Sequence, residues 1–209
     1  MTINNVVLIL SGGLDSTTLL YKLLNEGKRV TALTFNYGQK GKNEIECAKN
    51  ICKDLNVEHH IFDISEILNI LKWSSLINPE NNNVEKPKNT VVPSRNTILL
   101  ELATAFAISN KLDAVYYGAI KGDVGDYPDT TPEFIEKINE LNKVNNYEYI
   151  PIFAPFVDKE KYEVVKEALE MEVPLEKTWS CYLNGDEPCG KCFSCKGRME
   201  AIEKAKKIL

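Results

Sequence analysis

A short glycine-rich segment near the N-terminus has the residue types of a phosphate-binding loop. Residues 11–16 read Ser-Gly-Gly-Leu-Asp-Ser, between the apolar run 6–10 and the helix-like stretch 17–24. A glycine pair lets the backbone approach a ligand closely, and Ser16 is expected to cap a helix whose first amides and dipole face an anion. The segment therefore predicts a cradle for a phosphate chain, with a plain glycine turn as the alternative.

This loop lacks the lysine of the common phosphate loop, because no lysine lies between Met1 and Lys22. Without that point charge, the loop suits the binding and release of pyrophosphate better than transfer of a terminal phosphoryl group. Asp15 agrees with this interpretation. A carboxylate would repel phosphates unless a cation lies between them, and Mg²⁺ is commonly held by carboxylates together with phosphate oxygens. We therefore expect Mg²⁺ near Asp15.

Four of the six cysteines fall within fifteen positions and contain the Cys-X-X-Cys spacing twice. These four are Cys181, Cys189, Cys192 and Cys195. Four sulfurs without a histidine favour a closed structural zinc site with one ion per chain, and Gly190 suits the tight turn of such a site. An iron–sulfur cluster and a redox pair are the alternatives. Cys47 and Cys52 lie elsewhere, on a predicted helix, and are expected to be ordinary thiols.

The composition is that of an acidic globular protein. The 209 residues carry a net charge of -5 and are 44% hydrophobic, which is enough for one α/β domain with a small appendage. The negative charge argues against nucleic acid as a partner. No apolar run approaches ~18 residues, so we expect no membrane segment and a cytoplasmic location. The oligomeric state stays open, with a homodimer among the expected assemblies.

Strand-like apolar runs alternate with helical patterns along the chain. Strands are expected at 5–10, 29–36, 57–63, 112–119 and 149–153, and helices at 16–26, 40–55, 96–110 and 132–146. This order predicts a doubly wound α/β fold with a mainly parallel five-stranded sheet covered on both faces. The almost entirely apolar 96–110 helix is expected to be central. A composition break near Thr178 divides a predicted nucleotide-binding domain, 1–177, from a cysteine-containing appendage with a C-terminal helix, 178–209.

The predicted sheet gathers several polar segments at one edge. Ligands of open parallel sheets bind beyond the carboxyl ends of the strands. The segments expected there are 11–16, 36–42, 93–96 and 118–130. The asparagine-rich stretch 74–90 is too aperiodic for a core element and is expected to be either a lid or a surface excursion.

Similar blocks to those of a known family recur along nearly the whole chain. Besides the Ser-Gly-Gly-X-Asp-Ser loop and the cysteines, they are Phe35–Gln39, Val92–Asn96, Tyr127–Asp129, Pro132–Phe134 and Thr178–Tyr182. The loop resembles that of the PP-loop ATP pyrophosphatases, and the combination resembles the 7-cyano-7-deazaguanine synthases (QueC family). The resemblance implies an adenine nucleotide α-hydrolase-like fold. It also implies a C–N bond-forming ligase that converts 7-carboxy-7-deazaguanine and ammonia to the nitrile preQ0, a queuosine and archaeosine precursor, by way of an amide and two adenylations by ATP.

The resemblance assigns the first strand end and loop to ATP. The residues it implies are Leu10, Ser11, Gly12, Gly13, Leu14, Asp15, Ser16, Thr17 and Thr18. We expect Asp15, Ser16 and Arg95 to act in catalysis, because the planar fork of an arginine binds a phosphate or a carboxylate at two points. The alternative for Arg95 is an exposed position at a helix start.

Three further residues are candidates for contact with the substrate. Asp129 and Glu133 are expected to accept the adjacent N–H donors of a guanine-like edge, with Asp126 less favoured. Lys121 is expected to face the ATP phosphates, with a solvent-facing side chain as the alternative. No catalytic role is expected for His59 or His60.

The resemblance is weakest around the predicted substrate pocket. Thr130 and Thr131 replace the Cys-Arg usual in the family, the 121–126 loop is rearranged, and Lys40-Gly41 replaces a basic residue and histidine. Three other functions therefore stay open. They are a PP-loop relative acting on another deazaguanine-like target, a tRNA-thiolating enzyme and a nucleotide sensor without turnover.

Overall fold

Apolar residues on both faces of the first strand place it at the centre of the sheet. In β1 (Asn5–Ile9), Val6 and Leu8 are buried in one core and Val7 in a second core on the opposite face. The computed structural model describes residues 3–68, 74–78, 80, 81, 83–121 and 127–209. It has one five-stranded sheet in the order β3-β2-β1-β4-β5, with every neighbouring pair parallel. The predicted doubly wound parallel sheet is confirmed.

The other strands begin and end close to the predicted positions at one edge and are shorter at the other. They are β2 (Arg29–Asn36), β3 (Glu58–Asp63), β4 (Ala114–Tyr116) and β5 (Ile152–Phe153). The predicted 112–119 strand was too long. The Leu112 amide instead donates to Ala107 O at the end of the preceding helix, and Gly118 lies against the backbone of Ser16. The residues after β4 therefore belong to the edge where ligands bind.

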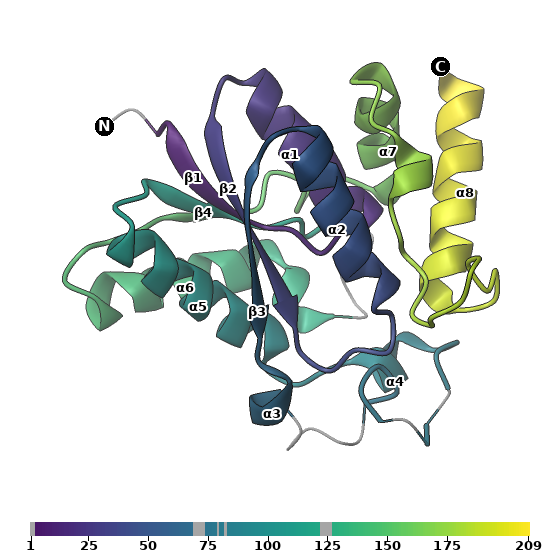
Figure 1. The fold of residues 1–209 in the computed structure, drawn as a ribbon, viewed down its shortest axis with the longest axis horizontal. Coiled ribbons are helices and arrows are strands. Elements are labelled where there is room, and N and C mark those ends of the chain that lie inside the picture. The colour runs from purple at the N-terminus through teal and green to yellow at the C-terminus, as the bar shows by residue number, and fades with distance from the viewer. Residues whose placement is uncertain (1–2, 69–73, 79, 82, 122–126) are drawn as a thin grey trace.

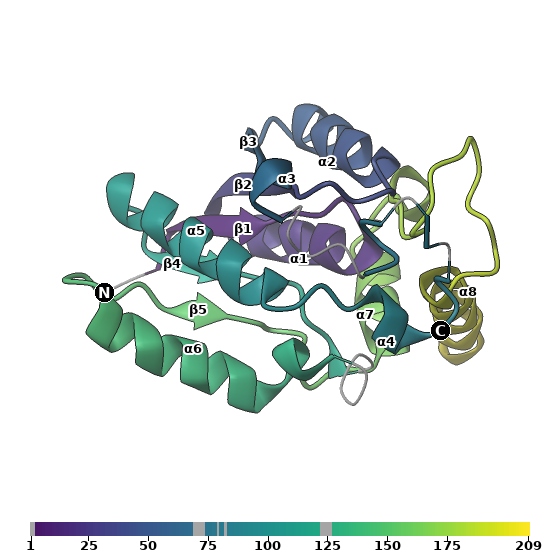
Figure 2. The same cartoon turned by 90° about the horizontal axis from the view of Figure 1, so that it is seen from below.

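Helices cover the sheet on both faces (Figures 1 and 2). The helices are α1 (Leu14–Asn25), α2 (Asn43–Asp54), α3 (Ser65–Leu68), α4 (Pro87–Thr90), α5 (Arg95–Ser109), α6 (Pro132–Asn145), α7 (Lys161–Glu170) and α8 (Phe193–Ile208), with 3-10 turns at Pro128–Thr130 and Leu175–Lys177. Helices α1, α2, α7 and α8 share one core, and α5 and α6 share the other. As predicted, α5 is central, because it packs on both β1 and β4.

Helix α7 was missed in the sequence, although its pattern is amphipathic. Val164, Val165 and Ala168 are buried against α1 and α8, and Glu160 and Glu163 form a capping box at its start. Figure 1 shows α8 beside α7 at one end of the molecule. Because Ala201 and Ala205 of α8 enter the same core as α1, the C-terminal helix packs on the nucleotide-binding domain proposed for residues 1–177.

The 74–90 segment is more buried than either prediction for it required. Ser74 and Ser75 are fully buried, and Leu76 and Thr90 line the hollow described below. Val84 packs against Trp179 and the C-terminal cysteines. Residues 79 and 82 lie outside the described part of the chain. Within that part, no helix is long and apolar enough to cross a membrane.

Candidate functional site

A crevice of about 270 Å³ lies at the carboxyl ends of the strands. It joins the four polar segments that the sequence placed there and adds residues from α2, α7 and the C-terminal region. The lining includes Leu10, Ser11, Gly13, Leu14, Asp15, Ser16, Tyr37, Gln39, Glu44, Arg95, Asn96, Gly118, Tyr127, Thr130, Lys161, Trp179, Ser180 and Tyr182. Gly12, Thr17 and Thr18 support this wall without lining it.

The glycine-rich loop is tied together by its two serines. Helix α1 starts at Leu14 with Gly13 in the N-cap position, so Ser16 lies within the first turn and the prediction that it caps the helix was wrong. The Ser16 hydroxyl instead accepts from the Ser11 amide at 3.2 Å and lies 3.0 Å from the Ser11 hydroxyl. These bonds fold the loop back on itself and leave the start of α1 facing the crevice, where its amides favour an anion.

Gly12 is required by packing against α2. Its φ is +86°, and a Cβ there would lie 2.0 Å from the carbonyl oxygen of Glu44. Its own carbonyl accepts from the Trp179 amide at 3.0 Å. This glycine therefore lets α2 and the C-terminal region approach the loop, whereas the sequence suggested that both glycines serve the ligand.

Asp15 forms an ion pair across the crevice with Lys161, the first residue of α7. The Lys161 Nζ to Asp15 Oδ2 distance is 2.7 Å, and each side chain is only about one-fifth exposed. The second carboxylate oxygen, Oδ1, is buried and has no hydrogen-bond partner within the described residues. A buried carboxylate oxygen without a partner at a phosphate-binding loop fits a cation ligand. Lys161 was missed because its helix was missed.

Arg95, at the start of α5, lies over the ring of Tyr37. Its guanidinium carbon is 5.4 Å from the ring centroid, and its Nη1 donates to the Tyr37 hydroxyl at 3.3 Å. Burial alone would lower the pKa of Arg95, but Tyr37, Asp129 and Glu44 outweigh it and raise that pKa. Burial also raises the pKa of Tyr37 to about 12. The half-buried arginine is thus a fixed positive charge in the crevice wall.

Glu44, on the first turn of α2, is a second carboxylate in the crevice wall. Its Oε1 accepts from Gln39 Nε2 at 2.9 Å. Burial raises the pKa of Glu44 to about 7, and the Gln39 hydrogen bond and the Arg95 charge only partly oppose that rise. The sequence analysis did not single out Glu44, although Gln39 belongs to one of the blocks that it used.

The three predicted substrate residues lie outside the crevice lining. Lys121 is exposed and pairs with Glu160 at 3.6 Å. Glu133 is exposed on the first turn of α6, and Asp129 is half-buried, close enough to influence Arg95. Asp126 lies outside the described residues, as does most of the rearranged 121–126 loop. The structure therefore places only Asp129 of this set near the other predicted groups.

Hydroxyl groups form the wall near these predicted residues. The Tyr127 hydroxyl lies 2.6 Å from Thr90 Oγ1 and 3.3 Å from the Tyr182 hydroxyl. Thr130, at the position where the resemblance is weakest, is buried in the lining. Its side chain donates to the Tyr127 carbonyl at 2.8 Å. Thr130 thus supports the turn that carries Tyr127.

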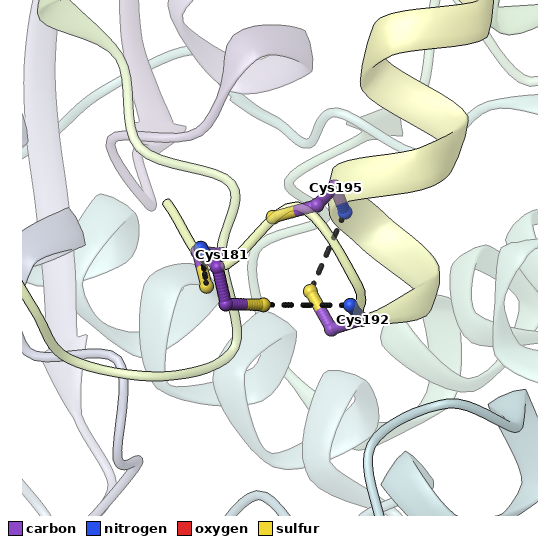
Figure 3. A group of neighbouring side chains, drawn as sticks. Cys181, Cys192 and Cys195 are labelled. Carbon is purple, nitrogen blue, oxygen red and sulfur yellow. Dashed lines mark hydrogen bonds between the residues drawn. The ribbon is translucent and has the colours of Figure 1, made fainter. Parts of the chain in front are cut away.

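The four predicted cysteines form one cluster, and their sulfurs all lie within 4.8 Å of one another. Figure 3 shows Cys181, Cys192 and Cys195 turned toward a common point. Backbone amides donate to the sulfurs of Cys181, Cys189 and Cys192 at 3.4 Å. Amide donors of this kind stabilise thiolates, the form that binds metals. The cluster can hold a metal ion, and Cys47 packs against it without joining it.

The cysteine cluster is attached directly to the crevice. Residues 179–182 line the crevice and lead into the cluster through Cys181. Arg198, on α8, donates to Thr178 Oγ1 at 2.7 Å and to Ser180 Oγ at 3.1 Å. A metal that fixes the cluster would therefore also fix one wall of the crevice.

Comparisons with known proteins agree along almost the whole chain. A family model described as queuosine biosynthesis protein QueC matches residues 5–206. The 7-cyano-7-deazaguanine synthase of Hahella chejuensis is 46% identical over 206 residues, covering 96% of this chain and 89% of the relative. The 7-cyano-7-deazaguanine synthase 1 of Colwellia psychrerythraea is 46% identical over 203 residues, covering 95% of this chain and 93% of the relative.

Solved structures share the fold at low sequence identity. A 4-thiouridine synthetase in complex with RNA and ATP matches with a TM-score of 0.59 at 17% identity, covering 98% of this chain and 51% of the other. An NMN synthetase from Francisella tularensis matches with a TM-score of 0.55 at 16% identity, covering 98% of this chain and 84% of the other. These likenesses establish the fold alone.

Proposed function

The chain belongs to the QueC family, and from that membership we propose that its crevice carries out the reaction named for its curated relatives, 7-cyano-7-deazaguanine synthesis. In this reaction 7-carboxy-7-deazaguanine and ammonia yield the nitrile at the cost of two ATP. The chain is then a ligase that forms C–N bonds. The observation that carries the proposal is the meeting of the 11–16 loop, Arg95 and the cysteine cluster around one crevice.

ATP is proposed to bind along the 11–16 loop. The exposed amides at the start of α1 suit pyrophosphate, and Lys161 supplies the positive charge that the loop itself lacks. Asp15, with its unpartnered Oδ1, would hold Mg²⁺. The ion, when bound, neutralises phosphate charge during displacement of pyrophosphate. Ser16 holds the loop in shape through Ser11.

The carboxylated substrate is proposed to bind between Arg95 and the tyrosines. Arg95 would orient the substrate carboxylate, and Tyr127 and Tyr182 offer an aromatic wall for the flat deazaguanine ring. Asp129 stays our choice of acceptor for the guanine-like edge because it lies near Arg95. Lys121 and Glu133 stay predictions, since both side chains are exposed.

The chemistry consists of two activations at one carbon. The substrate carboxylate attacks the α-phosphate of ATP, pyrophosphate leaves, and ammonia displaces AMP to give the amide. The amide oxygen attacks a second ATP, and loss of AMP leaves the nitrile. Because water would hydrolyse the acyl adenylate, the crevice must exclude it. The buried residues Leu76 and Thr90, from the segment considered as a lid, close one side of the crevice.

The cysteine cluster is proposed to hold a structural zinc ion. All four sulfurs lie within the span of a tetrahedral site, in which Zn–S bonds of about 2.3 Å are usual. The bound ion would tie residues 181–195 together and so fix the adjoining crevice wall. It takes no part in the reaction. Zinc rather than an iron–sulfur cluster is our choice because the site is closed and lies beside the crevice rather than in it.

The setting of the enzyme is part of the proposal. Unpaired thiols throughout the chain suit the reducing cytoplasm. The negative charge, -5, favours small-molecule substrates over nucleic acid. A homodimer stays a prediction, which light scattering of the purified protein would test.

Pyrophosphate exchange tests the proposal without requiring the complete reaction. With Mg²⁺, ATP and 7-carboxy-7-deazaguanine but no ammonia, the protein should incorporate labelled pyrophosphate into ATP. A deazaguanine that lacks the carboxylate should not support exchange. Exchange that is absent, or that proceeds equally without the carboxylate, would contradict the proposed adenylation. A tRNA-thiolating enzyme or a nucleotide sensor would fail this test.

A further inference from the structure

The proposed reaction requires a proton acceptor, and no residue discussed so far fills that role. Ammonia becomes the nitrogen of a nitrile, so all three of its N–H bonds break. The carboxylates in the described lining of the crevice are Asp15 and Glu44. Asp15 is paired with Lys161 at 2.7 Å, and its free oxygen suits a cation. Glu44 has a hydrogen bond to an amide group and no ion pair within the described residues.

Glu44 is held in a defined position between the phosphate-binding loop and Arg95. Gln39, which donates to Glu44 at 2.9 Å, is itself buried and fixed. The Gln39 Oε1 accepts from the Tyr37 amide at 2.8 Å, and its Nε2 also donates to the Phe35 carbonyl at 3.2 Å. The backbone of Glu44 touches Gly12 of the loop. The carboxylate therefore lies on the wall that joins the two groups assigned to phosphates and substrate.

The charges around Glu44 suit reversible protonation near neutral pH. Arg95 faces it from the start of α5 and Tyr37 from the end of β2, while Cys47 lies one turn further along α2. Asp15 is the titratable group of the loop that Glu44 packs against. Burial holds the pKa of Glu44 at about 7, and a general base works best when its pKa lies near the operating pH.

We propose that Glu44 is the general base that takes protons from the nitrogen in both halves of the reaction. In the first half, the ammonia nitrogen forms the C–N bond while the bond from carbon to the AMP oxygen breaks. AMP leaves with that electron pair, and one N–H proton passes to the Glu44 carboxylate. In the second half, the amide nitrogen gives up a proton as its oxygen bonds to phosphorus. It gives up another as the C–O bond breaks and the C≡N bond forms.

Glu44 returns each proton to solvent between these transfers, so the residue is unchanged over the cycle. No oxidant or reductant is needed, because both oxygen atoms lost by the carboxylate leave on AMP. This inference rests on the function proposed above and extends it. It assigns a chemical role to a side chain that the loop motif and the cysteine cluster do not contain.

The test compares Glu44→Gln with Glu46→Gln, which removes an exposed carboxylate two positions along the same helix. Both variants should remain folded by circular dichroism and should retain their metal. We expect Glu44→Gln to keep substrate-dependent pyrophosphate exchange within a few-fold of wild type. We expect it to lower nitrile formation by about 100-fold or more, the usual contribution of a general base. Glu46→Gln should match wild type in both assays.

The pH dependence provides a second measurement. Wild-type kcat/KM for ammonia, corrected for the fraction present as free ammonia, should fall at low pH with an apparent pKa near 7. That fall should be absent from the residual activity of Glu44→Gln. Nitrile formation that is unchanged in this variant would overturn the assignment, while wild-type turnover would still support the proposed function. Loss of pyrophosphate exchange in the folded variant would also overturn it, because Glu44 would then act in adenylation.

Discussion

Lys161 supplies the charge that the phosphate-binding loop lacks, and replacing it tests this role directly. In Lys161→Gln, the partner of Asp15 is lost, and one of the two Asp15 oxygens already has no partner. Each side chain is about one-fifth exposed, so the pair resembles a charge-assisted hydrogen bond more than a surface ion pair. We expect the free energy of unfolding to fall by about 1–2 kcal/mol. For a chain of this size, this corresponds to a decrease in Tm of roughly 2–8 °C.

The effect on ATP binding should be larger than the effect on stability. A charge-assisted hydrogen bond to phosphate is worth about 1.5–3 kcal/mol, so the Kd for ATP should rise by about 10- to 150-fold. Isothermal titration calorimetry of the purified variant measures this change. Lys166→Gln, on the exposed side of the same helix, is the matched control and should bind ATP as wild type does.

The double variant Asp15→Asn/Lys161→Gln separates the two roles of Lys161. Removing both charges leaves no unpaired carboxylate, so the double variant should be more stable than Lys161→Gln alone, although it should still bind ATP poorly. Wild-type ATP affinity in Lys161→Gln would refute the reasoning. The lysine would then only neutralise Asp15, and the positive charge for pyrophosphate would have to come from another residue.

Three other outcomes follow from the same structure. Cys192→Ser should lose zinc by metal analysis and unfold at lower temperature, whereas Cys47→Ser should keep the metal; stoichiometric iron in the native protein would contradict the zinc assignment. Gly12→Ala should destabilise the chain by about 3 kcal/mol or more, because its Cβ would lie 2.0 Å from the Glu44 carbonyl, whereas Gly27→Ala, with open space around it, should cost about 1 kcal/mol in chemical denaturation. The folded state holds the Glu44 proton more tightly than the unfolded state, so the contribution of Glu44 to stability is greatest below pH 4.5 and falls as the pH rises to about 7. Glu44→Gln should therefore exceed wild type in stability by about 1–2 kcal/mol above pH 7 and by nothing near pH 4.5, and equal pH dependence of the two proteins would contradict the burial of this carboxylate.

Local patterns in the sequence predicted the features that depend on nearby residues. The glycine-rich loop, the cysteine cluster and the central α5 helix all lie where their spacing placed them. Alternating strands and helices also predicted the parallel sheet, because a parallel connection needs a crossover helix.

Contacts between distant segments could not be predicted in the same way. Lys161 meets Asp15 from 146 positions along the chain, and nothing in the local sequence marks that lysine among the many others. Gly12 looked like a ligand-contacting glycine, but the reason for its conservation of space is the Glu44 carbonyl of a neighbouring helix. Glu133 looked like a substrate acceptor from its motif, whereas its position on α6 leaves it exposed. Each depends on tertiary packing rather than on spacing.

The central claim is that one crevice turns a carboxylate into a nitrile through two adenylations. Purified protein with 7-carboxy-7-deazaguanine, ammonium, Mg²⁺ and ATP should yield the nitrile by mass spectrometry, with two AMP and two pyrophosphates released for each nitrile formed. The amide should appear early and then decline. Absence of the nitrile, or ATP cleavage to ADP and phosphate in place of AMP and pyrophosphate, would contradict the account.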